Sequence, residues 1–573
     1  MKKYLFIALA AFGLAACTDN VDDPNSPNYK GELEESYIAI NLMSADLESR
    51  ALEGDTYGYE DGTTEERKIT TAYFFFFDEN GNPFNVLGVN DGATAPDPAQ
   101  QAKNHLPLTI TPTTPEGESV NISDISNAVL VLNTYKGIYP KQIVAVLNWT
   151  PQDKAYSLSD LHGHLATLGN DGDGYVMSNS VYMDGAGKMV DAVAITEDSI
   201  KKNANDAKNA PIDIYVERTA AKVVLTASGK VANTENIFEL QNEELLKPVG
   251  GSDIKVYMQL LGWELFNDYS NSTLLKNINT SWSIDALGLT WNDSPYFRCY
   301  WASSQDTPLG DNFSWSYTSS SFPTSYGFTV AESANYATGT YTYCGENTNQ
   351  VNVTTDPRTK VILKGKLLQK NGDNYNQLEI ASWYGNEYAG EEALRIAVAN
   401  SLKYILYYSE DDGNSHHSIA PEHIACVTGL AGDKSYQVGF QLSTLGETKT
   451  WYQRSSDGGY TRFGDLSVDN DNKIKTNAHL AASVEPALLY ESGQTYYIVD
   501  IEHLGTVGAK YGVVRNHVYQ IDIKSIKGYG SPGYSGISFI KPEYPEEYED
   551  SYVAARINVL SWKIVKQGVN IVQ

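Results

Sequence analysis

The sequence contains few cysteines and few basic residues, and it lacks most of the common catalytic motifs. Four cysteines in 573 residues are too few for a disulfide framework. Acidic residues outnumber basic ones by 71 to 42, which gives a net charge of −29. A surface of that charge repels phosphate backbones, so we expect no nucleic-acid partner. The signatures H-E-x-x-H, G-x-S-x-G and G-x-x-x-x-G-K-S/T are absent. We therefore expect neither an enzyme nor a bound cofactor.

Histidine and aspartate clusters give only weak indications of metal binding. His162 and His164 lie two residues apart, which puts their rings on different faces of a helix. His416 and His417 lie in a polar stretch, and the aspartate-rich segments 171–173 and 469–472 lack the spacing of a Ca²⁺ loop. Exposed loop histidines and Asx-rich turns explain these clusters, and we expect no metal site. Three cysteines are expected to be structural: Cys299, Cys344 and Cys426.

The composition favours β-structure. Hydrophobic residues make up 42% of the chain, enough to bury a core, and tyrosines number 40 against six methionines. Leucines at helical spacing predict two helices, at 157–168 and 391–408. Short apolar segments bounded by turn residues predict strands at 37–43, 69–77, 128–133, 142–148, 212–227, 255–266, 359–368, 496–501, 517–526, 556–565 and 568–572. Because strands dominate, we expect a mostly-β protein with two antiparallel β-sandwich domains.

One segment has the composition of a linker. Residues 201–211 are rich in Lys, Asn and Ala and end in a proline. The sequence therefore predicts an N-terminal domain over 51–210 and a C-terminal domain over 211–550, with a terminal strand segment at 551–573.

The first residues predict export. Lys2 and Lys3 precede a 13-residue apolar stretch from Tyr4 to Ala16, which is too short to span a bilayer but suits a signal peptide. Small residues lead directly to Cys17, as in a bacterial lipobox, where the cysteine is lipidated and becomes the new N-terminus. An ordinary secretory cleavage near a cysteine is the alternative. We expect residues 1–16 to be a lipoprotein signal peptide and Cys17 to be the lipidation site.

The two ends of the chain carry complementary patterns. Near the N-terminus, Ile38, Ile40 and Leu42 alternate along one face of a predicted strand, and an Arg50-Ala51 bond follows in an acidic, polar stretch. The predicted terminal strands carry large apolar residues that need a groove: Ile557, Val559, Leu560, Trp562, Ile564, Val569 and Ile571. Such a strand could be added to the sheet of a neighbouring molecule. Alternatively, both ends are ordinary strands of their own sheets.

Several sequence blocks occur in a recognisable order along the chain. The most specific are Val514 to Ile526 and the terminal Ile557 to Lys563, an R-N-H-x-Y-x-I-x-I block followed by a V-x-x-W ending. Further blocks lie at Cys17, 49–51, 216–223, 343–348 and 366–372. A chain with these blocks in this order resembles the fimbrillins of the Bacteroidia, the type V pilins, and most of all the shaft subunits of Mfa-type fimbriae.

This resemblance implies a fold and a mode of assembly. It implies two transthyretin-like β-sandwich domains in a precursor exported as an outer-membrane lipoprotein. An Arg-specific protease would then remove residues 17–50 by cutting between Arg50 and Ala51. The groove vacated by Ile38, Ile40 and Leu42 would receive the C-terminal donor strand of the next subunit. The implied partners are other copies in a head-to-tail polymer, together with anchor and tip subunits, in a fimbrium at the cell surface that supports adhesion.

Three classes of function remain open from the sequence. The first is a structural shaft subunit without catalysis. The second is a tip or accessory adhesin of the same fold. The third is a surface lipoprotein that binds glycans through some of its nine tryptophans and 40 tyrosines. A terminal strand suited to donation favours the shaft subunit, because a tip subunit need not donate a strand.

Overall fold

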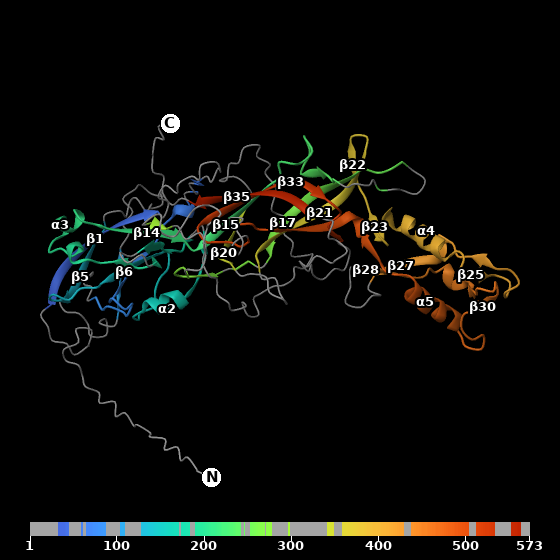
Figure 1. The fold of residues 1–573 in the computed structure, drawn as a ribbon, viewed down its shortest axis with the longest axis horizontal. Coiled ribbons are helices and arrows are strands. Elements are labelled where there is room, and N and C mark those ends of the chain that lie inside the picture. Colours follow the sequence, from blue (N-terminus) through green and yellow to red (C-terminus); the bar gives the residue numbers. More distant parts are fainter. Residues whose placement is uncertain are drawn as a thin grey trace, which may run out of the picture.

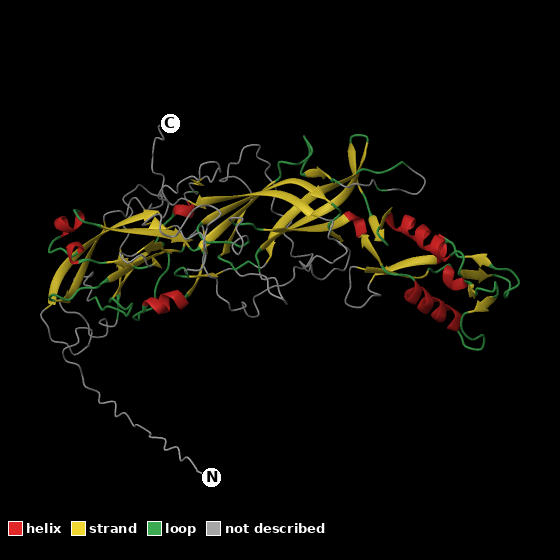
Figure 2. Cartoon of the chain, viewed as in Figure 1, coloured by secondary structure: helices red, strands yellow, loops and turns green. Residues whose placement is uncertain are grey.

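The computed structural model describes an elongated, mostly-β chain (Figures 1 and 2). The residues described are 33–44, 59–60, 63, 65–86, 103–108, 128–170, 173–183, 189–241, 246, 252–266, 268–269, 271–277, 296–297, 341–348, 358–428, 437–503, 511–532 and 552–562. The predicted mostly-β fold with a few short helices is confirmed. None of the helices in these ranges is long and apolar enough to cross a membrane.

The first body is built on one large sheet at the end of the molecule that holds β1 (Figure 1). The sheet surrounds a core to which β1, β3, β5, β6 and β14 all contribute buried aliphatic or phenylalanine side chains. The four phenylalanines of β3 are buried on both faces, as a continuous apolar strand predicts. In sheet order the strands are β4 (His105–Leu108), β3 (Ala72–Phe77), β6 (Gln142–Leu147), β10 (Met177–Asn179), β14 (Ile212–Arg218), β1 (Leu33–Ser44) and β5 (Ala128–Tyr135), with β13 (Val193–Ala194) beside β6.

The helix predicted over 157–168 is shorter in the structure. Ser157 caps α2 (Leu158–Gly163), and the side chains and backbone amides of Ser157 and Asp160 form a reciprocal capping box. His164 is extended and ends the helix, and the next residues form β7 (Leu165–Thr167), which pairs with β18 (Asn271–Thr273). Pairing with a distant strand thus overrides the leucine periodicity in the second half of the predicted helix.

The predicted linker at 201–211 also contains structure. It includes α3 (Ala204–Lys208), which packs against β1, and it leads directly into β14 of the first sheet. The chain passes to the second body only at Thr219, between β14 and β15. The boundary expected at 210/211 therefore cuts off the strand that pairs with β1 and β10. The polar segment 201–211 does not lie at this junction, because the chain crosses between the two bodies at the buried Thr219.

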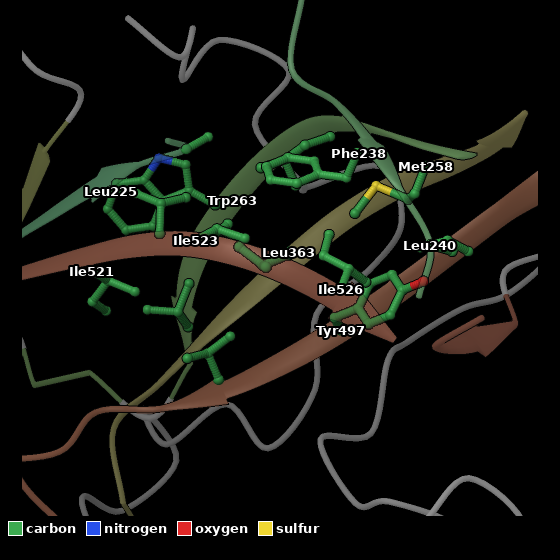
Figure 3. Packing of buried hydrophobic residues seen from close by; sticks show 14 of the residues in the cluster. Leu225, Phe238, Leu240, Met258, Trp263, Leu363, Tyr497, Ile521, Ile523 and Ile526 are labelled. Atoms are coloured by element: carbon green, nitrogen blue, oxygen red, sulfur yellow. The ribbon is translucent and has the colours of Figure 1, made fainter. Parts of the chain in front are cut away.

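The second body is a sandwich of two sheets (Figure 3). Its core contains Trp263, Leu363, Ile521 and Ile523 from both layers. One sheet has the order β2 (Tyr59–Glu60), β35 (Tyr552–Trp562), β33 (His517–Lys527), β15 (Ala220–Thr226) and β20 (Tyr341–Gly345). The other has β16 (Ile237–Glu239), β17 (Val256–Phe266), β21 (Lys360–Asn371), β32 (Gln494–Asp500) and β34 (Ser531–Pro532), with β22 (Asn374–Gln377) beside β21.

Most neighbouring strands are antiparallel, as predicted, but three pairs are parallel: β1–β14, β15–β33 and β2–β35. Parallel neighbours need long connections, and each of these pairs joins strands far apart in the sequence. The sequence pattern could not indicate them, because periodicity reports which face of a strand is buried but not which strand lies beside it.

A third core, which the sequence did not predict, is inserted between β22 and β32. It contains α4 (Gly390–Leu402) and α5 (Asp471–Ser483) and lies at the far end of the molecule from β1 (Figure 1). The predicted helix at 391–408 is confirmed as α4 but ends at Leu402. The strands of this inserted module are β23 (Ile380–Trp383), β24 (Asn386–Ala389), β25 (Leu406–Ser409), β26 (His417–Ser418), β27 (Ile424–Thr428), β28 (Gln437–Leu442), β29 (Thr450–Arg454), β30 (Tyr460–Arg462) and β31 (Ala487–Tyr490).

Small two- and three-stranded pairings form separate sheets. They are β8 (Gly169–Asn170) with β9 (Gly174–Tyr175), and β11 (Val181–Met183) with β12 (Met189–Val190) and β19 (Tyr296–Phe297).

Candidate assembly site

The N-terminal strand β1 is an interior strand of the first sheet. It pairs in parallel with β14 at five positions, from Ile40 beside Ile212 to Ser44 beside Val216. It pairs antiparallel with β5 at eight positions, from Leu33 to Ile40. The backbone of Tyr37 also exchanges two hydrogen bonds with Lys201, at 2.8 and 3.0 Å. β1 therefore fills a slot between β14 and β5.

The side chains of β1 make this slot hydrophobic. Ile38 and Ile40 are fully buried and Leu42 is 2% exposed, and all three pack into the core of the first body. Burying such side chains is worth about 1.5–3 kcal/mol each, so the three together contribute roughly 5–9 kcal/mol. Removing β1 would expose apolar core residues and leave both β14 and β5 with unpaired edges. A strand of similar pattern would be needed to close the gap.

The predicted processing and anchoring residues lie beyond the residues described. Cys17 lies upstream of β1, and Arg50 and Ala51 lie between β1 and β2, in the segment 45–58. Three of the predicted donor residues, Ile564, Val569 and Ile571, follow the end of β35. Their roles stay predictions.

The other predicted donor residues belong to β35, which pairs with a strand of its own chain. β35 runs antiparallel to β33 at ten positions, with one register shift between Ile523 and Ser525. In this ladder Ile557 lies opposite Ile521, Val559 opposite Tyr519 and Leu560 opposite Val518. Trp562 lies beside Glu60 of β2, on the other side of β35. The tail therefore occupies a place in its own sheet, so donating it to another copy requires that it first leave β33.

The slot and the tail are linked by a joint of buried charges. Lys222 Nζ lies 2.9 Å from Glu66 Oε1, and Lys276 Nζ lies 2.8 Å from Glu217 Oε1, with all four side chains fully buried. Arg515, also fully buried, donates from Nη2 to the main-chain oxygen and the hydroxyl of Thr273, each at 2.8 Å. Its Nε lies 3.5 Å from Glu346. These pairs come from both bodies and meet where the chain crosses between them.

Two of the blocks that carry the family resemblance build this joint. The amide of Asn516 donates to Ala220 O at 2.7 Å, and the amide of Arg218 donates to the side chain of Asn516 at 3.3 Å. Asn516 adopts a left-handed backbone conformation (φ 56°), which asparagine tolerates better than most residues. The blocks 216–223 and 514–526 are therefore neighbours, through the parallel pairing of β15 with β33.

Glu66 connects this joint to the segment that follows Arg50. It lies in the short 3-10 helix η1 (Glu65–Arg67), where Thr63 and Glu66 cap each other through backbone-to-side-chain hydrogen bonds of 2.7 and 3.1 Å. Its main-chain oxygen accepts a 3.0 Å bond from Arg218 Nε, and Tyr343 donates to its carboxylate. Burial by itself raises the pKa of Glu66. The ammonium of Lys222 and the hydrogen bonds from Tyr343, Lys222 and Thr63 outweigh burial and hold the pKa below its usual range.

Glu66, Lys276 and Glu346 were not identified from the sequence as functional residues. Glu66 lies in a run of charged residues that reads as an exposed loop, and nothing in its spacing indicates a partner more than 150 positions away. A capping pattern, T-x-x-E at 63–66, was the one local signal available.

The weak metal and redox indications have structural explanations in the part of the chain that is described. His162 forms an ion pair with the buried Asp191 at 2.6 Å, and His416 stacks on Tyr460 with ring centroids 3.8 Å apart. No group of three or more His, Cys, Asp or Glu side chains in the described ranges could hold a metal ion. Cys344 is a buried free thiol and Cys426 a half-buried one.

The fold and these elements define a class: a mostly-β protein whose first and last described strands are both built into sheets, with buried ion pairs where the two bodies meet. Residues 488–568 match the family model for the major fimbrial subunit protein type IV, fimbrillin, C-terminal. The matched residues contain β32, β33 and β35, so the resemblance to the fimbrillins is confirmed and its matched part includes the tail strand. No curated protein matches the chain.

Solved structures of fimbrial proteins are also similar to this chain. A fimbrilin (FimA) from Porphyromonas gingivalis W83 has 13% identity and a TM-score of 0.36, with 93% of this chain and 98% of that chain covered. The tip fimbrial protein Mfa3 from Porphyromonas gingivalis has 11% identity and a TM-score of 0.29, with 92% and 100% covered. Because these TM-scores lie below 0.5, the resemblance to the fimbrillins rests on the match at 488–568.

Proposed function

We propose that this chain is a structural subunit of a fimbrial shaft that polymerises by strand exchange after proteolysis. The observation that carries the proposal is the position of β1, an interior strand that lies directly upstream of the Arg50-Ala51 bond. Cleavage at one bond can release this interior strand, and its loss would destabilise a domain that has to remain folded by itself. It is useful if the vacated slot must accept another strand.

The proposed donor is the C-terminal tail of another copy. The tail brings alternating apolar residues and, in this chain, pairs with one long strand and one very short one. A head-to-tail exchange propagates into a filament, whereas a closed two-fold dimer does not. Five or more apolar side chains buried in the slot at about 1.5–3 kcal/mol each must together offset both the release of the tail from β33 and the cost of ordering it in its new place.

The remaining expectations from the sequence complete this proposal. Cys17 is lipidated and carries the precursor to the outer membrane, and an Arg-specific protease removes residues 17–50. The partners are further copies of the chain, with anchor and tip subunits at the two ends of the fimbria. The Cys17→Ala variant should fail to mature, and mass spectrometry of the wild-type precursor should detect lipid on the Cys17 residue.

Electron microscopy before and after Arg-specific proteolysis tests the proposal. The purified precursor should be monomeric, and the cut protein should form fibres whose N-terminal residue is Ala51. Deleting residues 556–573 should leave a folded monomer that cannot donate. Trp562→Ala should slow fibre growth more than Lys566→Ala, its control in the same tail. Long fibres from the truncated, cut protein would refute strand donation.

An adhesive role has separate support in the inserted module. Of the ten large hydrophobic side chains that are exposed among the described residues, eight lie in this module, including Tyr384 (63% exposed) and Tyr404 (69%). Exposed tyrosines suit stacking on saccharide rings. A glycan array should show binding that the Tyr384→Ala and Tyr404→Ala variants lose if the chain is an adhesin. If the two variants bind as the wild type does, or if no glycan binds, the adhesive role is refuted and the shaft role is the one proposal left.

A further inference from the structure

The short strand β2 covers one end of the tail. In the sheet order β2-β35-β33, β2 occupies the outer edge, and it pairs in parallel with the last residues of β35: Tyr59 with Ser561, and Glu60 with Trp562. The inner edge of β35 pairs with β33 from Tyr552 to Ser561. The end of the tail nearest Trp562 is thus held on two sides, whereas the end nearest Tyr552 is held by β33.

The end of β35 that β2 covers is the one farther along the chain from β34 and β33. β35 is the last strand described, whereas before Tyr552 the chain leads back to β34 and β33. A strand opens from its ends before its centre, because a residue released at an end regains conformational freedom without moving the rest of the fold. Any pairing at Ser561 and Trp562 therefore acts on the first step of release.

In the uncut chain β2 is tethered on both sides. Upstream, residues 45–58 connect it to β1, which is locked into the first sheet by thirteen residue pairings, five with β14 and eight with β5. Downstream, it is a few residues from Glu66, which is fixed by the buried Lys222 and by Arg218. Arg50 lies in the upstream tether.

We propose that β2 is a clasp that keeps the tail in its own sheet until the chain is cut at Arg50. The inference rests on the proposed function and deepens it. Two paired residues have little stability of their own, so the clasp depends on the high effective concentration that two fixed anchors impose. Cutting at Arg50 removes one anchor. One cleavage then both frees the slot of β1 and loosens the tail, so that an uncut precursor neither accepts nor donates a strand.

Hydrogen exchange of the tail amides tests the clasp on the full-length chain. The background variant Arg50→Ala keeps the chain uncut. Adding Tyr59→Pro and Glu60→Pro removes both amide donors of β2, whereas the matched control Glu60→Ala changes only a side chain and keeps the donor. In the proline variant we expect the amides of residues 557–562 to exchange at least about tenfold faster than in the control. Amides of β17 and β21 should be unchanged, which verifies that the second body is folded.

Wild-type protein cut with an Arg-specific protease supplies the second comparison. Its tail amides should exchange at least about tenfold faster than those of the uncut chain, measured in the first minutes before fibres appear. Equal exchange in the proline variant and its control, or in cut and uncut chains, would overturn the clasp. Faster exchange without fibre formation would leave the clasp standing and refute the shaft role. Fibres that form without any change in tail exchange would refute the clasp and leave the shaft role standing.

Discussion

Truncating one buried side chain of β1 should measurably weaken the binding of the cleaved propeptide to the slot between β14 and β5. Ile40 is fully buried and is paired with a strand on each side, with Ala128 of β5 and Ile212 of β14. Replacing a buried isoleucine with alanine removes packing and leaves a cavity, at a cost of about 2–5 kcal/mol. The side chain of the adjacent Asn41 is half-buried and donates to Asp213 Oδ1 at 2.8 Å on the surface. Asn41→Ala is therefore a matched control that should cost about 1 kcal/mol or less.

The assay follows the release of the propeptide after cleavage at Arg50. If β1 is held by its own packing, the cut peptide stays bound until it dissociates. A loss of 2–5 kcal/mol, at 1.4 kcal/mol per factor of ten, corresponds to a complex weakened by roughly 30-fold to several thousand-fold for Ile40→Ala. Dissociation can be timed with a fluorophore attached near the N-terminus of the peptide. If Ile40→Ala and Asn41→Ala peptides leave at the same rate, β1 is not held by core packing and the slot argument is wrong.

Three further predictions concern the joint and the cores. Glu66→Gln should destabilise the protein by about 3–5 kcal/mol, seen as an earlier urea transition, because Lys222 is left buried without its counter-charge. Burial lowers the pKa of His105 to about 4. Between pH 6.5 and 4 the unfolded state therefore binds a proton that the folded state does not, and the free energy of unfolding should fall by about 2 kcal/mol. His105→Gln should flatten that part of a plot of melting temperature against pH. Gly229→Ala should lower the melting temperature by several degrees, because the added Cβ would lie 1.7 Å from Lys524 O, whereas Gly163→Ala, with nothing within 4 Å, should change it little.

The sequence predicted strands well where one strand alone carries the information. Alternation or continuous apolarity placed β1, β3, β6 and β33 within a few residues of their observed bounds. Periodicity also found α4, since its buried face repeats along a single helix. It failed at 164–168, where a leucine pattern typical of a helix pairs as a strand with β18. It also missed α5, whose start lies in an aspartate- and asparagine-rich stretch that reads as a turn.

The candidate site was predictable in its chemistry but not in its connections. The inward-facing residues of β1 follow from alternation, and their burial at 0–2% exposure agrees with that pattern. Their neighbours do not follow, because β5 and β14 lie more than 80 positions away along the chain. The same reason hid the place of β35 beside β33 and the ion pair between Glu66 and Lys222. Long-range pairing is set by the whole fold, and no local pattern reports it.

The buried joint also explains why the slot and the tail can act as one device. Burying three ion pairs costs desolvation that well-packed apolar residues would avoid, so stability alone is a weak reason for them. Their value lies in geometry: Arg515 reaches Thr273 and Glu346, and Lys222 reaches Glu66, only in one relative placement of the two bodies. An apolar contact would tolerate sliding, whereas displaced charges would be left buried and unpaired. The joint thus fixes two elements relative to each other. One is the start of β33, which lies beside the end of the tail, and the other is η1, which anchors the clasp. A subunit that must receive a strand in one body and give one from the other needs that fixed relation, because each exchange sets the position of the next subunit.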